Sequence, residues 1–332
     1  MMRFLVALVF VGSLRAAIDG TVVNRTSGKP QPGVSITLVK PGQGGMRTIG
    51  TTSSDSNGHF AFAQDEPGGG PQLLQASYKG VNYNKLMTPN VPTSNVELDI
   101  YEATKSAAVA HVAEQMLVIE PNSSQIAVSE TVMIQNGSNT TFNDPNSGEF
   151  RFYLPPAANG QVRVNAQGPQ GMPLPRAAEK TNETDVFKVD FPIKPGDTEI
   201  NVSYVLPAGS PFTFHGRVVG VKGMPTSPMR VIAPPGVSFN GNDLQQIGTE
   251  PKTQATIYNV NAPDLFSFDI SGVGSLHQDA DTEDDADRPP VTQGDPQIYT
   301  HLGWLLAIAF SVLGVGLLFL FRSSPVRSPY GK

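Results

Sequence analysis

The chain contains no cysteine in its 332 residues. This absence excludes thiol catalysis, iron–sulfur clusters and zinc sites with cysteine ligands. It also means that no disulfide stabilises the fold. Because exported eukaryotic domains of this size often carry disulfides, an exported chain without cysteine favours a bacterial envelope protein.

Basic residues are also few, with 23 Lys and Arg against 29 Asp and Glu. No basic cluster of the kind that binds nucleic acid occurs, so we expect no nucleic-acid partner. The main charged run is acidic, with six acids in residues 279–287. These carboxylates repel one another and the anionic lipid surface, which predicts an extended spacer over residues 276–300. The run lacks the central glycine and the closing glutamate of a calcium loop.

Long hydrophobic runs occur only at the two ends of the chain. Residues 302–321 carry no charge, and thirteen of them are Leu, Ile, Val or Phe. A helix of that length spans about 30 Å, the thickness of the hydrocarbon core of a bilayer. The sequence therefore predicts a transmembrane helix over 302–321 that holds the chain in the lipid bilayer. A core helix of a soluble domain is the alternative, but such helices are rarely apolar all round.

The residues beside this helix predict its orientation. Three basic residues and no acid follow it in the tail 322–332, whereas the acidic spacer precedes it. Lys and Arg stay on the cytoplasmic side, so we expect the tail inside and the rest of the chain outside. Residues 1–17 have a basic start and a short apolar run, which is typical of a cleaved signal peptide; an uncleaved anchor is the alternative. The expected protein is a single-pass type I protein of the cell membrane.

The chain between these ends favours strands over helices, because the whole sequence has 33 Gly and 29 Pro. Only the Ala-rich stretch 106–114 is compatible with a helix. Apolar and polar residues alternate instead, which is the period of a strand with one buried face. In residues 18–103 the alternation appears at 34–38, 74–78 and 96–101, with turns at 28–33 and 55–58 and a Gly-rich loop at 41–46.

Three motifs follow one another in this segment: I-x-G-x-V from Ile18, G-x-P-x-x-G-V-x-I-x-L from Gly28, and T-x-x-D-x-x-G-x-F-x-F from Thr52. Together with the later alternating strands, they resemble the carboxypeptidase regulatory-like domain over residues 18–103. That family is a seven-stranded β-sandwich similar to transthyretin, in a group sometimes called starch-binding-like. The resemblance implies this fold and no peptidase activity, because the module accompanies a catalytic domain. Residues 66–71 depart from the family's usual loop, which affects the expected loop length.

Residues 104–275 show the same alternation and predict a second β-sandwich region. Its inward faces are expected at Ile126, Val128, Val132 and Ile134, at Phe150, Phe152 and Leu154, at Phe187, Val189 and Phe191, and at Ile200, Val202, Tyr204 and Leu206. Further strands are expected over 212–221, 253–260 and 265–270, in the same sandwich or in a small third unit. The predicted fold class is all-β, with two tandem sandwiches, an acidic linker and one C-terminal transmembrane helix.

Motifs of catalysis are scarce, since the chain has no Gly-x-Ser-x-Gly elbow, phosphate loop or dinucleotide fingerprint. His111 and Glu114 have the His-x-x-Glu spacing of a zinc ligand pair in metallocarboxypeptidases, and His215 follows about a hundred residues later. In a strand, residues three apart point to opposite faces and cannot hold one ion, whereas in a helix they share a face. We therefore predict no catalytic residue, no cofactor and no metal site. A metallopeptidase-related enzyme is the last alternative.

The expected function is the presentation of β-sandwiches outside the cytoplasmic membrane, for structural or protein-interaction roles with an unidentified envelope protein. The alternative is a carbohydrate-binding surface module, which the starch-binding-like resemblance implies. Sugar-binding faces usually stack aromatic rings, yet the one tryptophan, Trp304, falls in the predicted transmembrane helix. The tyrosines of the two sandwiches mostly fall within strand patterns, which favours packing over contact with a glycan.

Overall fold

The computed structural model describes residues 18–42, 45–63, 70–89, 91–169, 171–209, 212–262 and 264–276. Within these ranges the chain forms strands and two short 3-10 helices, so the predicted all-β class is confirmed. The predicted signal peptide, nearly all of the spacer and the predicted helix at 302–321 lie outside the described residues. No helix in the described ranges is long and apolar enough to cross a membrane.

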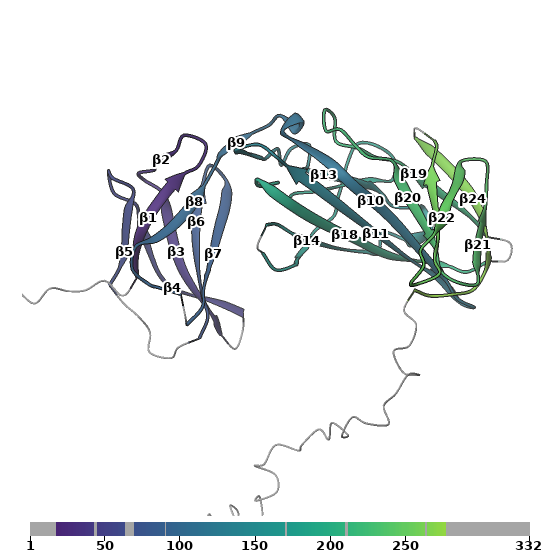
Figure 1. The fold of residues 1–332 in the computed structure, drawn as a ribbon, viewed down its shortest axis with the longest axis horizontal. Coiled ribbons are helices and arrows are strands. Elements are labelled where there is room, and N and C mark those ends of the chain that lie inside the picture. The colour runs from purple at the N-terminus through teal and green to yellow at the C-terminus, as the bar shows by residue number, and fades with distance from the viewer. Residues whose placement is uncertain are drawn as a thin grey trace, which may run out of the picture. The chain divides into compact units, whose positions relative to one another are not determined.

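The first sandwich is formed by two sheets of four strands (Figure 1). The central strand of one sheet pairs with all three of its partners: β1 (Ile18–Asn24) with β2 (Lys29–Pro30), β5 (His59–Phe62) and β8 (Val96–Ile100). The order in the other sheet is β4 (Gly45–Ser53), β3 (Ser35–Gly42), β6 (Gln72–Tyr78) and β7 (Val81–Met87). Alternate residues of these strands enclose one hydrophobic core, as the period of two predicts.

One predicted turn of this sandwich agrees with the structure, and one predicted loop differs from it. Gly33 has φ +72°, the left-handed conformation expected for the predicted turn. The predicted loop at 41–46 is wrong in extent, because β3 continues to Gly42 and β4 begins at Gly45. The two strands pair across this stretch, with Pro41 opposite Met46. Backbone hydrogen bonding across the hairpin therefore overrides the loop signal of the glycines.

The second sandwich is built on one sheet of eight strands. Its order is β15 (Leu174–Arg176), β14 (Val162–Gln167), β18 (Gly196–Pro207), β11 (Gln125–Asn136), β10 (Ala110–Pro121), β20 (Met229–Ala233), β23 (Thr256–Val260) and β22 (Leu244–Thr249). Two three-stranded sheets share its core: β13 (Phe150–Tyr153), β17 (Val186–Val189) and β16 (Glu179–Lys180), and then β19 (Phe212–Arg217), β24 (Leu265–Gly272) and β21 (Val237–Asn240). A single cluster of buried residues runs from Ala107 to Ile270, so the strands after residue 212 share the core of those before it.

The inward positions predicted for this region are buried as expected. Phe152, Val189, Ile200 and Val202 are each at most 1% exposed. Aromatic rings fill the end formed by β19, β21 and β24, where the ring of Phe268 lies 5.2 Å from that of Phe214. The predicted strand at 212–221 ends at Arg217, and the one at 253–260 begins at Thr256. Element positions were thus predicted better than element ends.

The helix considered for residues 106–114 does not form. A single 3-10 turn, η1 (Ala107–Val109), leads at Ala110 into β10. Because β10 pairs with β11 from Ala110 onward and Val112 bridges to Thr226 on the other side, backbone pairing overrides the helix propensity of the alanines.

A short joint connects the two sandwiches. β9 (Glu102–Thr104) leaves the first sandwich and pairs in parallel with β12 (Thr140–Phe142) of the second. The hydroxyl of Tyr83 lies 2.9 Å from that of Thr141, which is fully buried. Burial is the main cause that raises the pKa of Tyr83 to about 12. The Tyr83 hydroxyl also donates to the carbonyl of Tyr101 at 3.0 Å, so this ring fixes the joint from the first sandwich.

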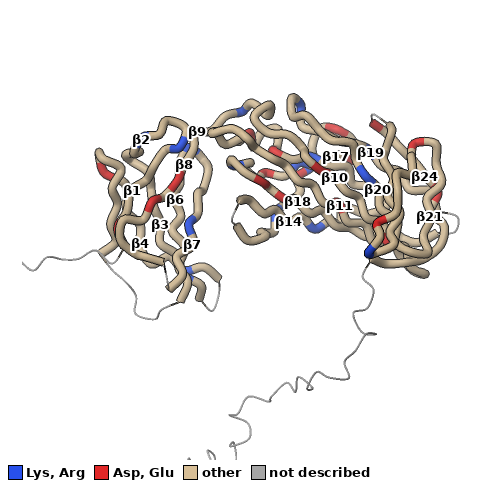
Figure 2. Tube along the Cα trace, in the orientation of Figure 1, with Lys and Arg blue, Asp and Glu red and all other residues tan. Residues whose placement is uncertain are grey.

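Charged residues are mixed over the described chain. Figure 2 shows Lys and Arg interspersed with Asp and Glu on both sandwiches. The expectation of no nucleic-acid partner stays a prediction.

Candidate functional site

A hollow of about 480 Å³ lies on the second sandwich between two turns. One turn follows β13 and contains the second 3-10 helix, η2 (Pro156–Ala158). The other joins β16 to β17 and spans residues 181–185. The hollow is lined by Leu154, Pro155, Pro156, Asn159, Gly160, Lys180, Thr181, Asn182, Glu183, Thr184, Asp185, Val186 and Phe187. Its volume is that of a site for a small molecule or a few residues of a partner chain.

Local hydrogen bonds shape both turns. The η2 turn ends in two left-handed residues, Asn159 at φ 51° and Gly160 at φ 72°. In the other turn the Thr181 hydroxyl accepts the Glu183 N–H at 3.1 Å and donates to the Val186 carbonyl at 2.9 Å. The Thr181 side chain therefore adds to the backbone hydrogen bond from the Thr181 N–H to the Val186 carbonyl at 3.0 Å, which closes this turn.

The two turns are tied to each other and to the sheet below. The Leu154 N–H donates to the Asp185 carbonyl at 2.9 Å. The Glu183 carboxylate lies between two guanidinium groups, with Arg151 Nη2 at 2.8 Å and Arg217 Nη1 at 3.7 Å. Arg217 pairs in addition with Asp264 at 2.7 Å. These contacts preorganise the hollow, because a bound partner need not order either turn.

The lining offers polar groups over an apolar floor. Leu154 and Val186 are buried, and Phe187 stacks on Phe152 with ring centroids 5.8 Å apart. The amides of Asn159 and Asn182 are exposed at the rim. The half-buried carboxylate of Asp185 makes no ion pair with any described residue. The lining therefore combines exposed hydrogen-bonding groups at the rim with buried apolar side chains beneath them.

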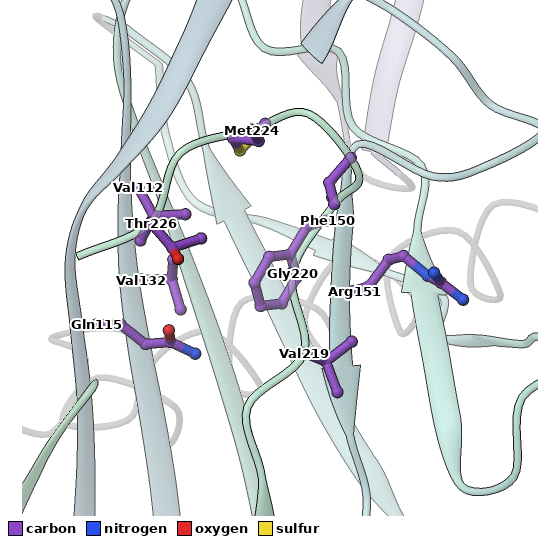
Figure 3. A pocket seen from close by; sticks show the side chains of 10 residues that line it. Val112, Gln115, Val132, Phe150, Arg151, Val219, Gly220, Met224 and Thr226 are labelled. Carbon is purple, nitrogen blue, oxygen red and sulfur yellow. The ribbon is translucent and has the colours of Figure 1, made fainter. Parts of the chain in front are cut away.

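A second, much smaller cavity of about 10 Å³ lies inside the same sandwich (Figure 3). Its wall is apolar except for Gln115, Arg151 and Thr226, and the Arg151 side chain points away from it. A volume of that size holds about one water molecule. It is too small for an organic ligand.

A buried carboxylate lies close to this cavity. Glu130 is only 6% exposed and accepts a hydrogen bond from Gln115 Nε2 at 2.6 Å. Burial raises the pKa of Glu130 to about 7, and the bond from Gln115 opposes this in part. Glu149 is also fully buried, but it accepts backbone N–H groups from Phe191 at 2.9 Å and Asp144 at 2.5 Å. Burial raises its pKa to about 7 as well. Neither group lines the hollow.

His111 and Glu114, which have the sequence spacing of a zinc ligand pair, do not lie on opposite faces of a strand as predicted. Both residues lie in β10, where a β-bulge between Val112 and Glu114 shifts the register. Val112 and Gln115 point inward, so His111 and Glu114 share the outer face. The argument that residues three apart point to opposite faces is therefore wrong here, because the extra residue of a bulge restores a common face.

Other contacts oppose a zinc site at this pair. Arg230 Nη1 donates to Glu114 Oε1 at 3.0 Å and occupies the carboxylate. His215 lies in β19, in a different sheet from β10. No group of three metal-ligating side chains occurs among the described residues. That the chain binds no zinc stays a prediction.

The motif residues of the first sandwich have structural tasks. Asp55 Oδ1 accepts the N–H groups of Asn57 and His59 at 2.8 and 2.9 Å, which lowers the pKa of Asp55, mainly through His59. Gly58 has φ +77°, and a Cβ there would lie 2.8 Å from the Pro30 side chain. Ser54 Oγ accepts the Val34 N–H at 2.9 Å. The motifs therefore specify turns and close backbone approaches.

Comparison with family models gives the same result. Residues 17–100 match the carboxypeptidase regulatory-like domain. The sequence resemblance is thus confirmed for this segment, which is about a quarter of the chain. A comparison with curated proteins found no match. The regulatory-like domain contributes no residue to the hollow, which lies wholly in the second sandwich.

Sequence reasoning did not find the hollow or the buried glutamates. The hollow depends on turns brought together by β13 and β17, which local patterns do not reveal. Glu130 did carry a signal, because it occupies an inward position in the alternation from Ile126 to Ile134. An acid in that register predicts a buried carboxyl group.

Proposed function

We propose that this chain is a non-catalytic, single-pass membrane protein that presents two β-sandwiches outside the cytoplasmic membrane of a bacterial cell. In this proposal the second sandwich binds an envelope protein through the hollow between residues 154–160 and 180–187. The observation that supports the proposed interaction is the preorganised hollow. Its turns are held by hydrogen bonds and by the Glu183 carboxylate, which lies between two arginines. The uncharged run at 302–321 and its basic tail support the membrane part.

A topology experiment tests the membrane part. Protease added to intact spheroplasts is expected to digest residues 18–300 and to leave a fragment containing 302–332, detected by a tag after Lys332. The reason is that the basic tail stays inside while the acidic spacer is outside. Lysed spheroplasts serve as the control, in which the tag is also lost. An ectodomain that resists protease in intact spheroplasts but is digested after lysis contradicts this orientation.

Site-specific crosslinking tests the interaction part. A photoreactive amino acid at Asn182, on the rim of the hollow, is expected to give one discrete adduct in native membranes. The matched control places the same group at Gln246, an exposed residue of β22 away from the hollow lining. Asp185→Asn and Glu183→Gln are expected to reduce the adduct from Asn182, since they change the charge of the lining. Equal adducts from both positions, or none, contradict the assignment of the hollow.

A carbohydrate is the second candidate partner, favoured by the amide and hydroxyl groups of Asn159, Thr181, Asn182 and Thr184 in the lining. Such groups bind sugar hydroxyls, but the described lining exposes no aromatic face for stacking, since Phe187 is only 8% exposed. A glycan screen of the purified chain separates the two candidates. Saturable binding that Asn182→Ala abolishes would replace the protein partner with a glycan.

A further inference from the structure

The eight-stranded sheet of the second sandwich carries apolar residues on both of its faces. Leu117 and Ile119 of β10 point inward and belong to the core. Met116 and Val118 alternate with them, so they point to the opposite face, where they are half-buried. They belong neither to the core cluster nor to the side chains packed against it. We call the face formed by these alternate residues of the sheet the outer face.

Apolar side chains of neighbouring strands meet on the outer face. Val118 of β10 lies opposite Ile232 of β20, which in turn lies opposite Ile257 of β23. On the other side of β10, Ala127 of β11 lies opposite Val205 of β18, which is 46% exposed. Figure 1 shows β18, β11, β10 and β20 side by side in this sheet. Antiparallel strands with one solvated face usually place polar residues there, and contiguous exposed apolar side chains mark a surface that another molecule covers.

Several polar side chains on the outer face already have partners. Thr131 Oγ1 donates to Asn201 Oδ1 at 2.7 Å, and Asn201 Nδ2 donates to Glu199 Oε1 at 2.7 Å. Arg230 Nη1 donates to Glu114 Oε1 at 3.0 Å. Because these groups bond to one another within the face, a partner that covers them does not leave them without hydrogen bonds.

The size of the outer face matches what a stable dimer needs. Its three long strands β10, β11 and β18 have 12 residues each, and β14, β20 and β23 extend it on both sides. With a rise of about 3.4 Å per residue and a spacing of about 4.8 Å between strands, the face offers roughly 800 Å². A stable protein interface takes about 800 Å² from each partner.

The charges of the outer face favour a second copy over a lipid surface. Its outer positions in the six strands carry Glu114, Glu120, Asp197 and Glu199 against Arg163 and Arg230. This excess of acids repels an anionic lipid surface. The central row, which runs from Ser203 through Ser129 and Val118 to Ile257, is uncharged. A two-fold contact centred on this row therefore brings no like charges together at its axis.

We propose that two copies of this chain pack against each other through their outer faces, with the row through Val118, Ile232 and Ile257 at the centre. Two sheets that pack in this way lie about 10 Å apart, with their strands within about 30° of each other. Both copies contribute the same residues, so the contact is closed and adds no third copy. The residues that line the hollow do not lie on the outer face, so the dimer does not depend on the proposed envelope partner.

Cysteine crosslinking of the full chain tests the dimer, and the absence of native cysteine removes any background from the chain itself. Ser129→Cys places a thiol in the central row. The matched control is Ser238→Cys, at an exposed position of β21 in the opposite layer of the sandwich. A short membrane-permeable bismaleimide added to intact cells is expected to join Ser129→Cys chains into a dimer of twice the chain mass and to leave Ser238→Cys monomeric. Equal yields from the two positions, or no dimer from Ser129→Cys, overturn the proposal.

A lysine in the central row tests the contact itself. Ile232→Lys in the Ser129→Cys chain is expected to abolish the dimer, because the contact would bring the new charges of both copies into an apolar interface. Ser203→Lys repeats the test at a polar position of the row, so no apolar side chain is lost. Val273→Lys, at a residue 61% exposed after β24, is the control and keeps the dimer. A dimer that persists in both row variants overturns the proposal.

Other occupants of the outer face give different results in the same experiment. An adduct of Ser129→Cys whose mass is not twice that of the chain assigns a different protein to the face. A Ser129→Cys thiol that forms no adduct and is protected from a water-soluble maleimide until detergent is added assigns the face to lipid. Either result replaces the second copy and overturns the proposal.

Discussion

Gly20→Ala is expected to destabilise the regulatory-like domain by about 3 kcal/mol, a large part of the stability of a domain this size. Gly20 lies in β1, where β8 approaches so closely that a Cβ would be 2.0 Å from the Val96 carbonyl oxygen. It would also be 2.8 Å from the Phe60 ring, so neither side can make room. Because the oxygen belongs to the backbone of a paired strand, relief requires a shift of β8 itself. Urea denaturation and hydrogen exchange of β1 and β8 measure the loss.

Gly33→Ala is the matched control for this prediction. Both substitutions reduce the conformational entropy of the unfolded chain by the same amount, so the difference between them isolates the folded state. Gly33 has φ +72° but nothing within 4 Å of its Cβ position, so only backbone strain of about 1 kcal/mol is expected. Equal effects of the two substitutions would contradict the close approach of β8 to β1.

Glu130→Gln is expected to stabilise the second sandwich at pH 8 by up to about 3 kcal/mol. Burial raises the pKa of this carboxyl from its ordinary 4.5 to about 7, so at pH 8 the fold holds a buried charge. Glutamine has the same shape without the charge, and its carbonyl oxygen still accepts from Gln115. Urea denaturation of wild type and variant at pH 5 and pH 8 measures the gain.

The pH dependence follows from the direction of this shift. Between pH 4.5 and about 7 the folded chain keeps the Glu130 proton while the unfolded chain loses it. The contribution of Glu130 is therefore fully present below pH 4.5 and declines as the pH rises to about 7. Glu130→Gln should remove this decline. A variant whose stability falls between pH 5 and pH 8 as steeply as the wild type contradicts the buried charge.

Glu149 offers a contrast within the same sandwich. Its pKa is also raised to about 7 by burial, but its two oxygens accept backbone N–H groups from Asp144 and Phe191. A glutamine has one acceptor oxygen and would leave one of these donors unpaired. We therefore expect Glu149→Gln to destabilise at pH 5 by about 1–3 kcal/mol, where Glu130→Gln is nearly neutral.

Much of the fold was predictable because its strands bury one face each. The alternation at Ile200, Val202 and Tyr204 predicts β18 without any tertiary information. The bulge in β10 was not predictable. It is a shift in the register with β11 between Val112 and Glu114, and the sequence of β10 alone does not indicate that register. The helix signal of the alanines before it failed for the same reason. The local sequence of a segment does not indicate which distant strands will pair with it through backbone hydrogen bonds.

The sites were less predictable than the fold. Asp55 and Gly58 were visible as turn residues because their spacing has a local mechanism. Arg176 lies over the Phe191 ring only because the chain brings β15 beside the segment after β17, which no spacing in the sequence indicates. The lining of the hollow has the same origin in two turns more than twenty residues apart.

The parallel pairing of β9 with β12 also bears on how the molecule responds to a stretching force that separates the two sandwiches. The chain passes from one sandwich to the other through β9, so a force that separates the two acts first on this ladder of three residues. The ladder between β10 and β11 inside the second sandwich is far longer. Under tension we therefore expect the joint to yield before either core, so that the chain lengthens while both sandwiches stay folded.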